Sequence, residues 1–362
     1  MPSLSTNISE SRVDSVLKTN PHVDGGWFWS KYSVNPYLGC SYGCAYCFLR
    51  QRNYGLAPKP VKSADFIDAF AQNIQVKINA AEVLDRELDQ VPPDVIIAGD
   101  YQPIDSRYRI SRQSLQVCLD HGFPTMIIAK SPTVLRDLDL IQSIGERSWA
   151  CVVFSIAFSE SGPQQTVLEP AASSIESRFR AMQKLREAGV YTGTAMMPIM
   201  PFLNDTEDNL RAIVAQTERH GGQFVLAGGM VLGDGLETQL FPVLKQIDEA
   251  LPMRYQQLYQ GGFSPHDHSW SQLGRKVRKL CNEHGLAHRI QRYIAPGPLA
   301  INKRIAEKLF LKAYEMELSN AAENEILEMR KLAWQVEESP SRWTRDFPSP
   351  RTNAPEDTEL EE

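Results

Sequence analysis

The sequence has no long apolar run and no targeting segment at its start. No window of the 362 residues approaches the roughly 20 predominantly apolar residues that a membrane-spanning helix requires. The opening stretch MPSLSTNISESRVDS lacks the basic start and the apolar stretch of a secretory signal peptide. We therefore expect a cytoplasmic protein that has no membrane partner.

The chain also lacks an excess of positive charge. Its 38 lysine and arginine residues stand against 44 aspartate and glutamate residues, and the net charge is -6. Eight of the acids and three of the bases lie between Gln335 and Glu362, so the rest of the chain is nearly neutral. This balance excludes a protein that is coated with basic side chains for binding nucleic acid.

Cysteine is scarce and unevenly placed. Three of the six cysteines, Cys40, Cys44 and Cys47, lie within eight residues with the spacing C-x3-C-x2-C. An odd number of thiols in so tight a loop excludes an ordinary disulfide framework. Gly39 and Gly43 let the backbone turn, so that the three thiols converge on one metal site. The other cysteines stand singly in apolar or helical surroundings, where we expect buried thiols: Cys118, Cys151 and Cys281.

Three thiolates suit an iron-sulfur cluster better than zinc. A structural zinc site needs four protein ligands, and no second cysteine pair lies near the loop. A cluster held by three thiolates leaves one iron open to another ligand. A zinc loop that a distant histidine completes is the alternative.

The loop carries a family resemblance. C-x3-C-x2-C with an aromatic residue between the last two cysteines, here Tyr46, resembles the signature of the radical S-adenosylmethionine (SAM) superfamily. The resemblance implies that Cys40, Cys44 and Cys47 hold three irons of a [4Fe-4S] cluster, and that the amino and carboxylate groups of SAM chelate the fourth. It also implies a reducing partner such as flavodoxin or ferredoxin, and a 5'-deoxyadenosyl radical that abstracts hydrogen from a substrate.

Later segments narrow the resemblance to one branch. Between Lys31 and Leu232 the stretches NPYLGCSYGCAYCF, VIIAGDYQPID, AKSPTVLRDLDL, LEP and PIMPFLND are together similar to the DNA repair photolyase-type branch, which is related to spore photoproduct lyase. Spore photoproduct lyase carries a hydrogen-donating cysteine near the end of its second strand, where AGDYQPID has none. Tyr101 is the candidate substitute as a radical relay, and a packed, hydrogen-bonded phenol is the alternative.

Alternating patterns predict the fold. After an irregular arm over Met1 to Thr19, a first strand near Ser33 to Tyr37 leads into the cysteine loop. A helix is expected from Ser63, because apolar residues recur every three or four positions as far as Ile78. Strand and helix patterns then alternate up to Leu232, which gives six strands and predicts a parallel sheet with right-handed crossovers. The expected fold class is α/β, and six strands match the partial (β/α)6 barrel that the resemblance implies.

The chain divides into four expected segments. Residues 1–30 form an N-terminal arm, residues 31–235 the radical SAM (β/α)6 core, residues 236–335 a mainly helical C-terminal extension, and residues 336–362 a disordered acidic tail. In a parallel barrel, ligands gather where the strands end at their carboxyl edge. We therefore look for site residues at the strand ends.

Charged residues end two of the strands. The second strand ends in Gly99 and Asp100, where the resemblance implies that the methionine ammonium of SAM is received, and a carboxylate suits a cation. A plain strand-terminal turn is the alternative. The third strand delivers Lys130 at the end of an apolar run, where the carboxylate of SAM needs a cation.

Polar or flexible residues end the other strands. Ser131 follows the third strand and Ser155 ends the fourth, where the resemblance places Ser155 near the SAM carboxylate or ribose; a structural cap explains each equally well. Met197 ends the fifth strand at the expected adenine position, although a methionine there also fits the core. The candidate cofactor-binding residues are therefore Tyr46, Gly99, Asp100, Lys130, Ser131, Ser155 and Met197.

Two charged features lie outside the strand ends. Glu169 of the LEP segment and Arg178 lie in or beside a crossover, either as an ion pair that closes the site or as the solvated start of a helix. The stretch Arg275 to Arg292 has six lysines or arginines against one glutamate, and is the candidate surface for nucleic acid.

The main hypothesis is a radical SAM enzyme that abstracts hydrogen from an unidentified substrate, with a nucleic-acid lesion as the spore photoproduct lyase-like option. A second hypothesis keeps this chemistry but takes a peptide, a tRNA or a small metabolite as the substrate. The rival from another class is a non-catalytic zinc- or nucleic-acid-binding protein that uses the same loop and the basic stretch.

Overall fold

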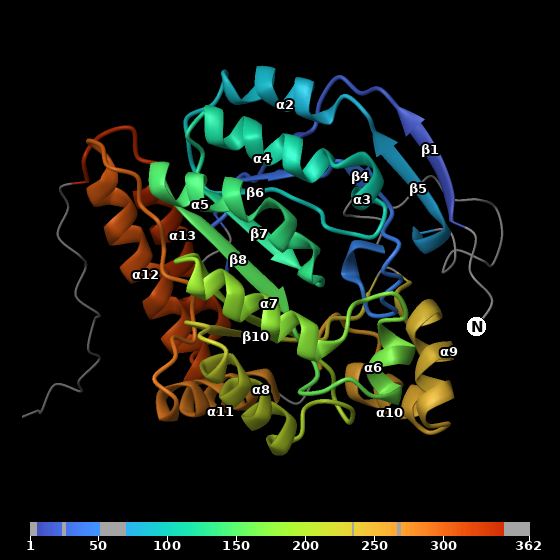
Figure 1. Ribbon diagram of the computed structural model, residues 1–362. Coiled ribbons are helices and arrows are strands. Elements are labelled where there is room, and N and C mark those ends of the chain that lie inside the picture. Colours follow the sequence, from blue (N-terminus) through green and yellow to red (C-terminus); the bar gives the residue numbers. More distant parts are fainter. Residues whose placement is uncertain (1–5, 24–26, 51–69, 234, 266–268, 344–362) are drawn as a thin grey trace, which may run out of the picture.

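A seven-stranded sheet forms the centre of the computed structural model, which describes residues 6–23, 27–50, 70–233, 235–265 and 269–343 (Figure 1). The strand order is β10-β9-β8-β7-β6-β3-β2. Every neighbouring pair from β10 to β3 is parallel, and only β2 pairs antiparallel with β3. The prediction of an α/β fold with six parallel strands is confirmed. The seven strands of the sheet are the antiparallel β2 (Leu17–Thr19) and the six parallel strands β3 (Tyr32–Val34), β6 (Ile96–Ile97), β7 (Thr125–Ala129), β8 (Ala150–Ser155), β9 (Tyr191–Ile199) and β10 (Val225–Gly229).

Helices cover both faces of this sheet (Figure 1). The crossover helices begin where the sequence supplies caps: the Ser174 and Thr206 hydroxyls accept hydrogen bonds from the first turns of two of them. One face carries α2 (Ala80–Leu88), α4 (Ile110–Asp120), α5 (Leu138–Arg147), α7 (Ile175–Glu187) and α8 (Glu207–Arg219), and the other carries α12 (Ala300–Leu318) and α13 (Glu323–Glu337). The remaining helices are η1 (Phe48–Arg50), α3 (Asp105–Tyr108), η3 (Pro132–Asp137), α6 (Pro163–Leu168), α9 (Glu237–Ile247), α10 (Leu251–Tyr259) and α11 (Ser269–Glu283).

The C-terminal helices cover only part of the inner face, which is the face of the sheet turned toward α12 and α13. Successive residues of a strand point to opposite faces, and Met126 and Val153 pack in one cluster with Phe310 of α12. Two residues after Met126, Ile128 is 36% exposed although it lies in a central strand. The helical cover of this face therefore ends before the carboxyl ends of the strands. Lys130 follows directly after β7, two residues beyond Ile128.

Two expectations for the first 80 residues are wrong. The arm is not irregular throughout, because it contains β1 (Asn7–Ser11) and β2, and β1 pairs in parallel with β5 (Asn73–Lys77). The helix expected as far as Ile78 is present at residues 70–72 but ends there, and β5 follows, in which Ile74 and Val76 are buried. Residues 51–69, where the same helix was expected to begin, lie outside the described residues.

The expected first strand is also divided in two. Tyr32–Val34 forms β3 of the large sheet, and Tyr37–Leu38 forms β4, which pairs antiparallel with β5 in a small sheet of order β1-β5-β4. Pro36 separates the two strands, and proline has no backbone N–H for a sheet ladder. The cysteine loop thus leaves from the small sheet and not from the large one.

The described chain beyond β10 is mainly helical, and its last residues pack against α12. Asn302 of α12, fully buried, donates a hydrogen bond to the backbone oxygen of Ser341 (2.9 Å) and accepts one from the backbone N–H of Trp343 (2.8 Å). The disorder expected from residue 336 is therefore wrong for residues 336–343, and residues 344–362 lie outside the described part. No helix in the described ranges is long and apolar enough to cross a membrane.

Candidate active site

The cysteine loop is fixed by backbone hydrogen bonds on two sides. The Cys40 N–H donates to the oxygen of Phe70 (3.0 Å), and the Ala45 N–H donates to the oxygen of Leu168 (2.9 Å). Gly39 has φ of 81°, and a Cβ there would lie 2.6 Å from the backbone oxygen of Asn73, so no other residue fits this turn. The segments that hold the loop are far apart in the sequence.

The three thiols of the loop lie close enough to influence one another. Burial, the nearby Asp100 and the other two thiols raise the pKa of Cys40. Burial raises the pKa of Cys44 to about 12, although the Lys130 ammonium opposes this shift. Burial also raises the pKa of Cys47. A bound cation would reverse these shifts, because it favours the thiolate form.

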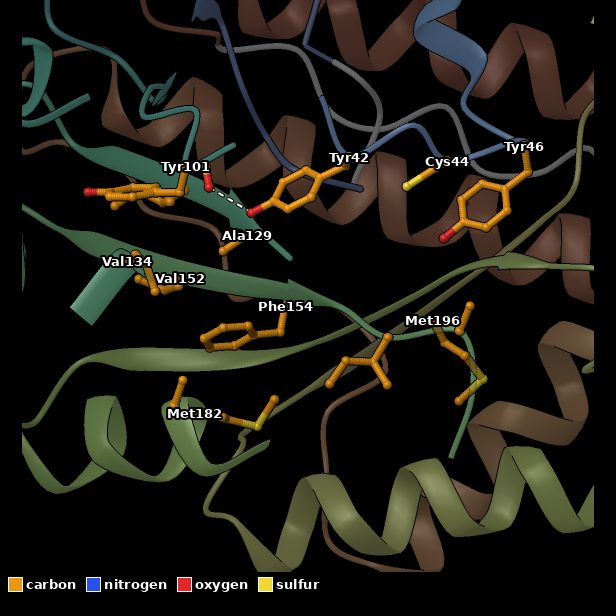
Figure 2. Packing of buried hydrophobic residues seen from close by; sticks show 14 of the residues in the cluster. Tyr42, Cys44, Tyr46, Tyr101, Ala129, Val134, Val152, Phe154, Met182 and Met196 are labelled. Carbon is orange, nitrogen blue, oxygen red and sulfur yellow. Dashed lines mark hydrogen bonds between the residues drawn. The ribbon is translucent and has the colours of Figure 1, made fainter. Parts of the chain in front are cut away.

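The side chains of the loop are chemically suited to bind a metal cluster, because each is a thiol that can ligate iron as a thiolate. All three cysteines are free thiols, Cys44 is buried, and Cys40 and Cys47 are half-buried. Within the described residues, no three or more His, Cys, Asp and Glu side chains already form a ligand sphere. Figure 2 shows Cys44 between Tyr42 and Tyr46. The described residues thus do not show the three thiols gathered as one ligand set, and their convergence on one metal site stays a prediction. A cluster with one open iron requires three thiolates, and the loop supplies three thiols.

Lys130 lies at the centre of a polar cluster beside the loop. Its Nζ donates hydrogen bonds to the Tyr46 hydroxyl (2.8 Å), Ser155 Oγ (2.9 Å) and Glu169 Oε1 (2.9 Å). The Tyr46 hydroxyl also donates to Glu169, and the Arg178 guanidinium binds Glu169 Oε2 at 2.5 Å. The structure thereby brings three predicted site residues, Tyr46, Lys130 and Ser155, into one cluster.

Glu169 and Arg178 form a buried ion pair. Both side chains are fully buried, so the alternative of a solvated helix start is wrong. Burial alone would raise the pKa of Glu169, but Lys130 and Arg178 hold it well below its usual value. Two cations thus share one carboxylate, and the cluster has one positive charge in excess. Such a site suits an anionic ligand.

Asp100 presents the opposite charge on the other side of the loop. Its Oδ2 accepts a hydrogen bond from Gln102 Nε2 (3.0 Å), and no described lysine, arginine or histidine forms an ion pair with it. Burial raises its pKa to about 6, although the hydrogen bonds from Gln102 oppose the shift. Gln102 also bonds the backbone of Gly39 and Ser41, the two neighbours of Cys40, and this places the Asp100 carboxylate near the first thiol. An unpaired carboxylate in this position suits a cationic ligand.

The other predicted residues lie around these two groups. Gly99 has φ of 85°, with the Tyr101 ring 3.0 Å from the position of a Cβ. The Ser131 hydroxyl accepts a hydrogen bond from the Thr133 N–H (3.2 Å) and caps η3, which favours the structural alternative. The backbone oxygen of Met197 accepts a hydrogen bond from Ser155 Oγ (3.2 Å), so β9 contacts the Lys130 cluster through its backbone.

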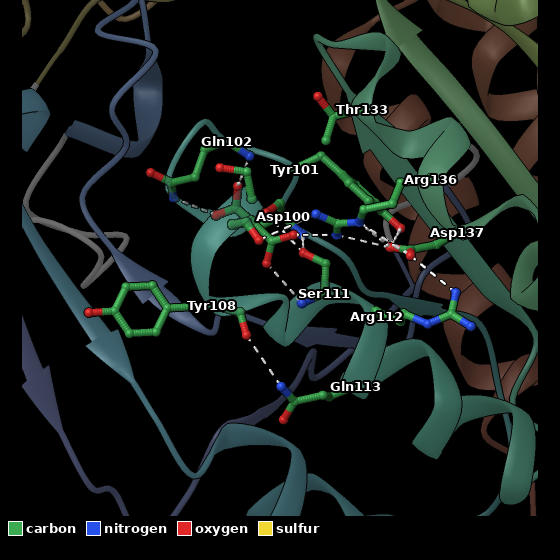
Figure 3. A network of polar contacts seen from close by, with 12 residues as sticks. Asp100, Tyr101, Gln102, Tyr108, Ser111, Arg112, Gln113, Thr133, Arg136 and Asp137 are labelled. Atoms are coloured by element: carbon green, nitrogen blue, oxygen red, sulfur yellow. Dashed lines mark hydrogen bonds and ion pairs between the residues drawn. The ribbon is translucent and has the colours of Figure 1, made fainter.

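Tyr101 is held away from the thiols. Its hydroxyl donates to Asp137 Oδ2 (3.0 Å), and in Figure 2 that hydroxyl points away from Cys44. Asp137 is fully buried and also binds Arg136 (3.0 Å) and Arg112 (3.2 Å), as Figure 3 shows. The geometry favours the packed, hydrogen-bonded phenol over the radical relay.

Removing the buried carboxylate of this network is expected to destabilise the protein. Asp137→Ala leaves Arg112, Arg136 and the Tyr101 hydroxyl without their common partner, and should lower the free energy of unfolding by about 3 kcal/mol. Asp139→Ala is the matched control, because Asp139 binds the same Arg112 (2.7 Å) but has a side chain that is 62% exposed. It should cost less than about 1 kcal/mol. Urea unfolding measures both, and equal losses would contradict the role given to burial.

The basic stretch makes ion pairs and other contacts within the molecule. Lys276, Arg278 and Lys279 lie 3.9, 2.5 and 3.9 Å from carboxylates of the same chain. Arg292 forms a nearly buried ion pair with Glu337. Arg275 donates to a backbone oxygen, and Arg289 lies over the rings of Trp27 and Tyr314. These contacts lessen the free positive charge of this surface, and nucleic-acid binding by it stays a prediction.

Comparisons with known proteins show uncharacterized relatives. No protein-family model matches the chain. An uncharacterized protein of Mycobacterium tuberculosis is 26% identical over 238 residues, which are 64% of this chain and 68% of the relative. An uncharacterized protein of Methanocaldococcus jannaschii is 28% identical over 184 residues, which are 49% of this chain and 64% of the relative. These relatives assign no activity.

The solved structures give a clear likeness in fold. A mutant of spore photoproduct lyase aligns with a TM-score of 0.54 at 15% identity, over 76% of this chain and 78% of that chain. A second mutant of spore photoproduct lyase, with bound AdoMet and dinucleoside spore photoproduct, aligns with a TM-score of 0.52 at 14% identity, over 76% of this chain and 78% of that chain. The chain therefore has the same overall fold as spore photoproduct lyase.

Proposed function

We propose that this chain is a radical SAM enzyme. One observation carries the proposal: the two ends of the cysteine loop contact groups of opposite charge. At Gly39 and Ser41 the loop is bonded to Gln102, which also binds the unpaired carboxylate of Asp100. At Tyr46 it is bonded to Lys130, whose cluster has one surplus cation. The amino-acid end of SAM carries one ammonium and one carboxylate, so its two charges match the two sides of the loop. The likeness in fold to spore photoproduct lyase supports the same proposal.

Each residue of the site has a distinct task in this proposal. Cys40, Cys44 and Cys47 hold a [4Fe-4S] cluster as thiolates. Asp100 receives the ammonium of SAM and Lys130 its carboxylate, while Glu169 keeps Lys130 oriented toward the loop. When bound and reduced, the cluster supplies the electron that cleaves SAM and so generates the radical for hydrogen abstraction. A small redox protein such as flavodoxin or ferredoxin supplies that electron in turn.

The substrate that we propose is a nucleic-acid lesion. The likeness to spore photoproduct lyase with a bound dinucleoside lesion supports this class over a peptide, a tRNA or a metabolite. The exposed Ile128 adds an apolar surface beside Lys130 on the inner face of the sheet. The residues Gly99, Asp100 and Tyr101 follow β6, so return of hydrogen from a cysteine at that position is not part of the proposal.

The test is anaerobic reconstitution with iron and sulfide, followed by reduction with dithionite in the presence of SAM. We expect brown protein with bound iron and acid-labile sulfide, and we expect chromatography to detect 5'-deoxyadenosine. Deuterium transfer from labelled oligonucleotide lesions into that product then identifies the substrate. A cluster-loaded protein that forms no 5'-deoxyadenosine would refute the proposal, and so would a protein that binds only zinc.

A further inference from the structure

Gln102 is a buried amide whose hydrogen-bonding atoms are all engaged. Its side chain is fully buried, and its Nε2 donates to Asp100 Oδ2 (3.0 Å) and to the backbone oxygen of Gly39 (3.3 Å). Its Oε1 accepts from the backbone N–H of Ser41 (3.0 Å). The amide orientation is fixed by chemistry, because a rotated amide would turn its oxygen toward two acceptors.

These contacts connect the cysteine loop to the segment that follows β6. Gly39 and Ser41 are the two neighbours of Cys40, so Gln102 holds the backbone on both sides of that thiol. Its own backbone N–H also donates to Asp100 Oδ1 (3.3 Å), so both carboxylate oxygens are directed by this one residue (Figure 3). The Cys40 N–H is also bonded to the backbone oxygen of Phe70, so the loop has a support that does not depend on Gln102.

Only an amide performs this task at this position. Glutamate keeps an acceptor for the Ser41 N–H but has no donor for Asp100, and methionine of similar length offers neither group. Asp100 has no ionic partner in the described part of the chain, so its orientation depends on Gln102. The sequence gives no sign of this role, because a single glutamine after a strand has no distinctive pattern.

We propose that Gln102 is a positioning residue that holds the Asp100 carboxylate beside Cys40, where the carboxylate receives the ammonium of an α-amino acid ligand. This inference rests on the proposed function, in which that ligand is SAM. Gln102 touches neither the reacting atoms nor the ligand. It acts through Asp100, and its loss therefore affects recognition of the ammonium specifically.

The test compares two ligands that differ only in that ammonium. Isothermal titration calorimetry measures the affinity of the reconstituted protein for S-adenosylhomocysteine and for its desamino analogue. We expect the wild-type protein to bind S-adenosylhomocysteine more tightly than the desamino analogue. In Gln102→Met, the ratio of the two affinities should be about tenfold smaller. Affinity for the desamino analogue and iron content should be unchanged. Gln142→Met is the matched control, because Gln142 makes a comparable bond to the Ala188 oxygen (2.9 Å) at the opposite end of the barrel.

The outcomes distinguish the positioning role of Gln102 from the proposed function of the chain. Equal weakening of both ligands by Gln102→Met, or no change in either, would overturn the positioning role while the proposed function stands. A wild-type protein that binds neither ligand, or binds both equally, would overturn the charge-matching argument of the proposed function instead. If Gln102→Met does not fold, Gln102→Asn is the second test, because its amide is one methylene too short to reach both Asp100 and Ser41. It should show the same loss of preference.

Discussion

Cys44→Ala is expected to abolish formation of 5'-deoxyadenosine and to prevent stable binding of the cluster. Cys44 is the buried member of the three thiols and lies beside Lys130, which lowers its pKa against the effect of burial. With two thiolates left, a second cluster iron has no protein ligand, and a cluster held by two ligands dissociates or is degraded. Both iron content and product formation should therefore fall together.

The control for this experiment is another buried cysteine. Cys118→Ala removes a thiol that is fully buried in α4 and belongs to the hydrophobic core. It should keep wild-type iron and sulfide content, with a loss of about 1 kcal/mol in unfolding free energy. Iron analysis, sulfide analysis and chromatography of the reaction mixture check both variants. A Cys44→Ala protein with full iron content and full product formation would remove Cys44 from the proposed ligands.

The strand ends are the part of the site that the sequence predicts best. Apolar runs such as MIIA predict a buried strand, and the first polar residue after such a run falls at the carboxyl edge of the sheet. This reasoning selects Lys130 and Ser155 as site residues, the family resemblance implies that Ser155 lies near the SAM carboxylate or ribose, and the Lys130 Nζ and Ser155 Oγ lie 2.9 Å apart. Period-two alternation also explains why both point to the face that carries the candidate site.

Contacts between distant segments were beyond the same reasoning. The spacing of Ile74 and Ile78 fits a helix, but β1 supplies a parallel partner across more than 60 residues of sequence, and Asn73–Lys77 forms β5 instead. Charged stretches are misleading for a similar reason. The sequence makes Arg278 a candidate for binding polyanions, but in the structure it forms an ion pair with Glu315 of α12. Tertiary partners decided these cases, and one sequence does not reveal them.

Glu169 shows why burial could not be inferred from local pattern. The segment LEP precedes a helix, and an acidic residue before a helix is commonly solvated and favoured by the helix dipole. Here the backbone of Leu168 binds Ala45 of the cysteine loop, which brings the next residue inside the protein. Arg178 is three residues after the start of α7 and completes the pair.

Glu169→Gln is expected to lower the free energy of unfolding by about 3 kcal/mol at neutral pH. The substitution keeps the shape of the side chain but removes the one carboxylate that Lys130 and Arg178 share. Arg178 is fully buried, so water cannot replace the lost charge. Glu187→Gln on the exposed side of α7 is the control for the same chemical change, and should alter stability by less than about 0.5 kcal/mol.

The pH dependence of this difference identifies its electrostatic origin. The pKa of Glu169 in the folded protein lies well below its usual value of 4.5. A carboxyl with a lowered folded-state pKa contributes its full stabilisation above the pH at which it titrates in the unfolded chain, and loses it as the pH falls toward the folded-state pKa. The stability difference between wild type and Glu169→Gln should therefore be constant near neutral pH and shrink below about pH 4.5. Urea unfolding at pH values from 7 down to the lowest at which the protein stays folded measures this stability difference. A difference that does not change with pH would indicate lost packing. The buried ion pair would then not be what holds Lys130 at the loop.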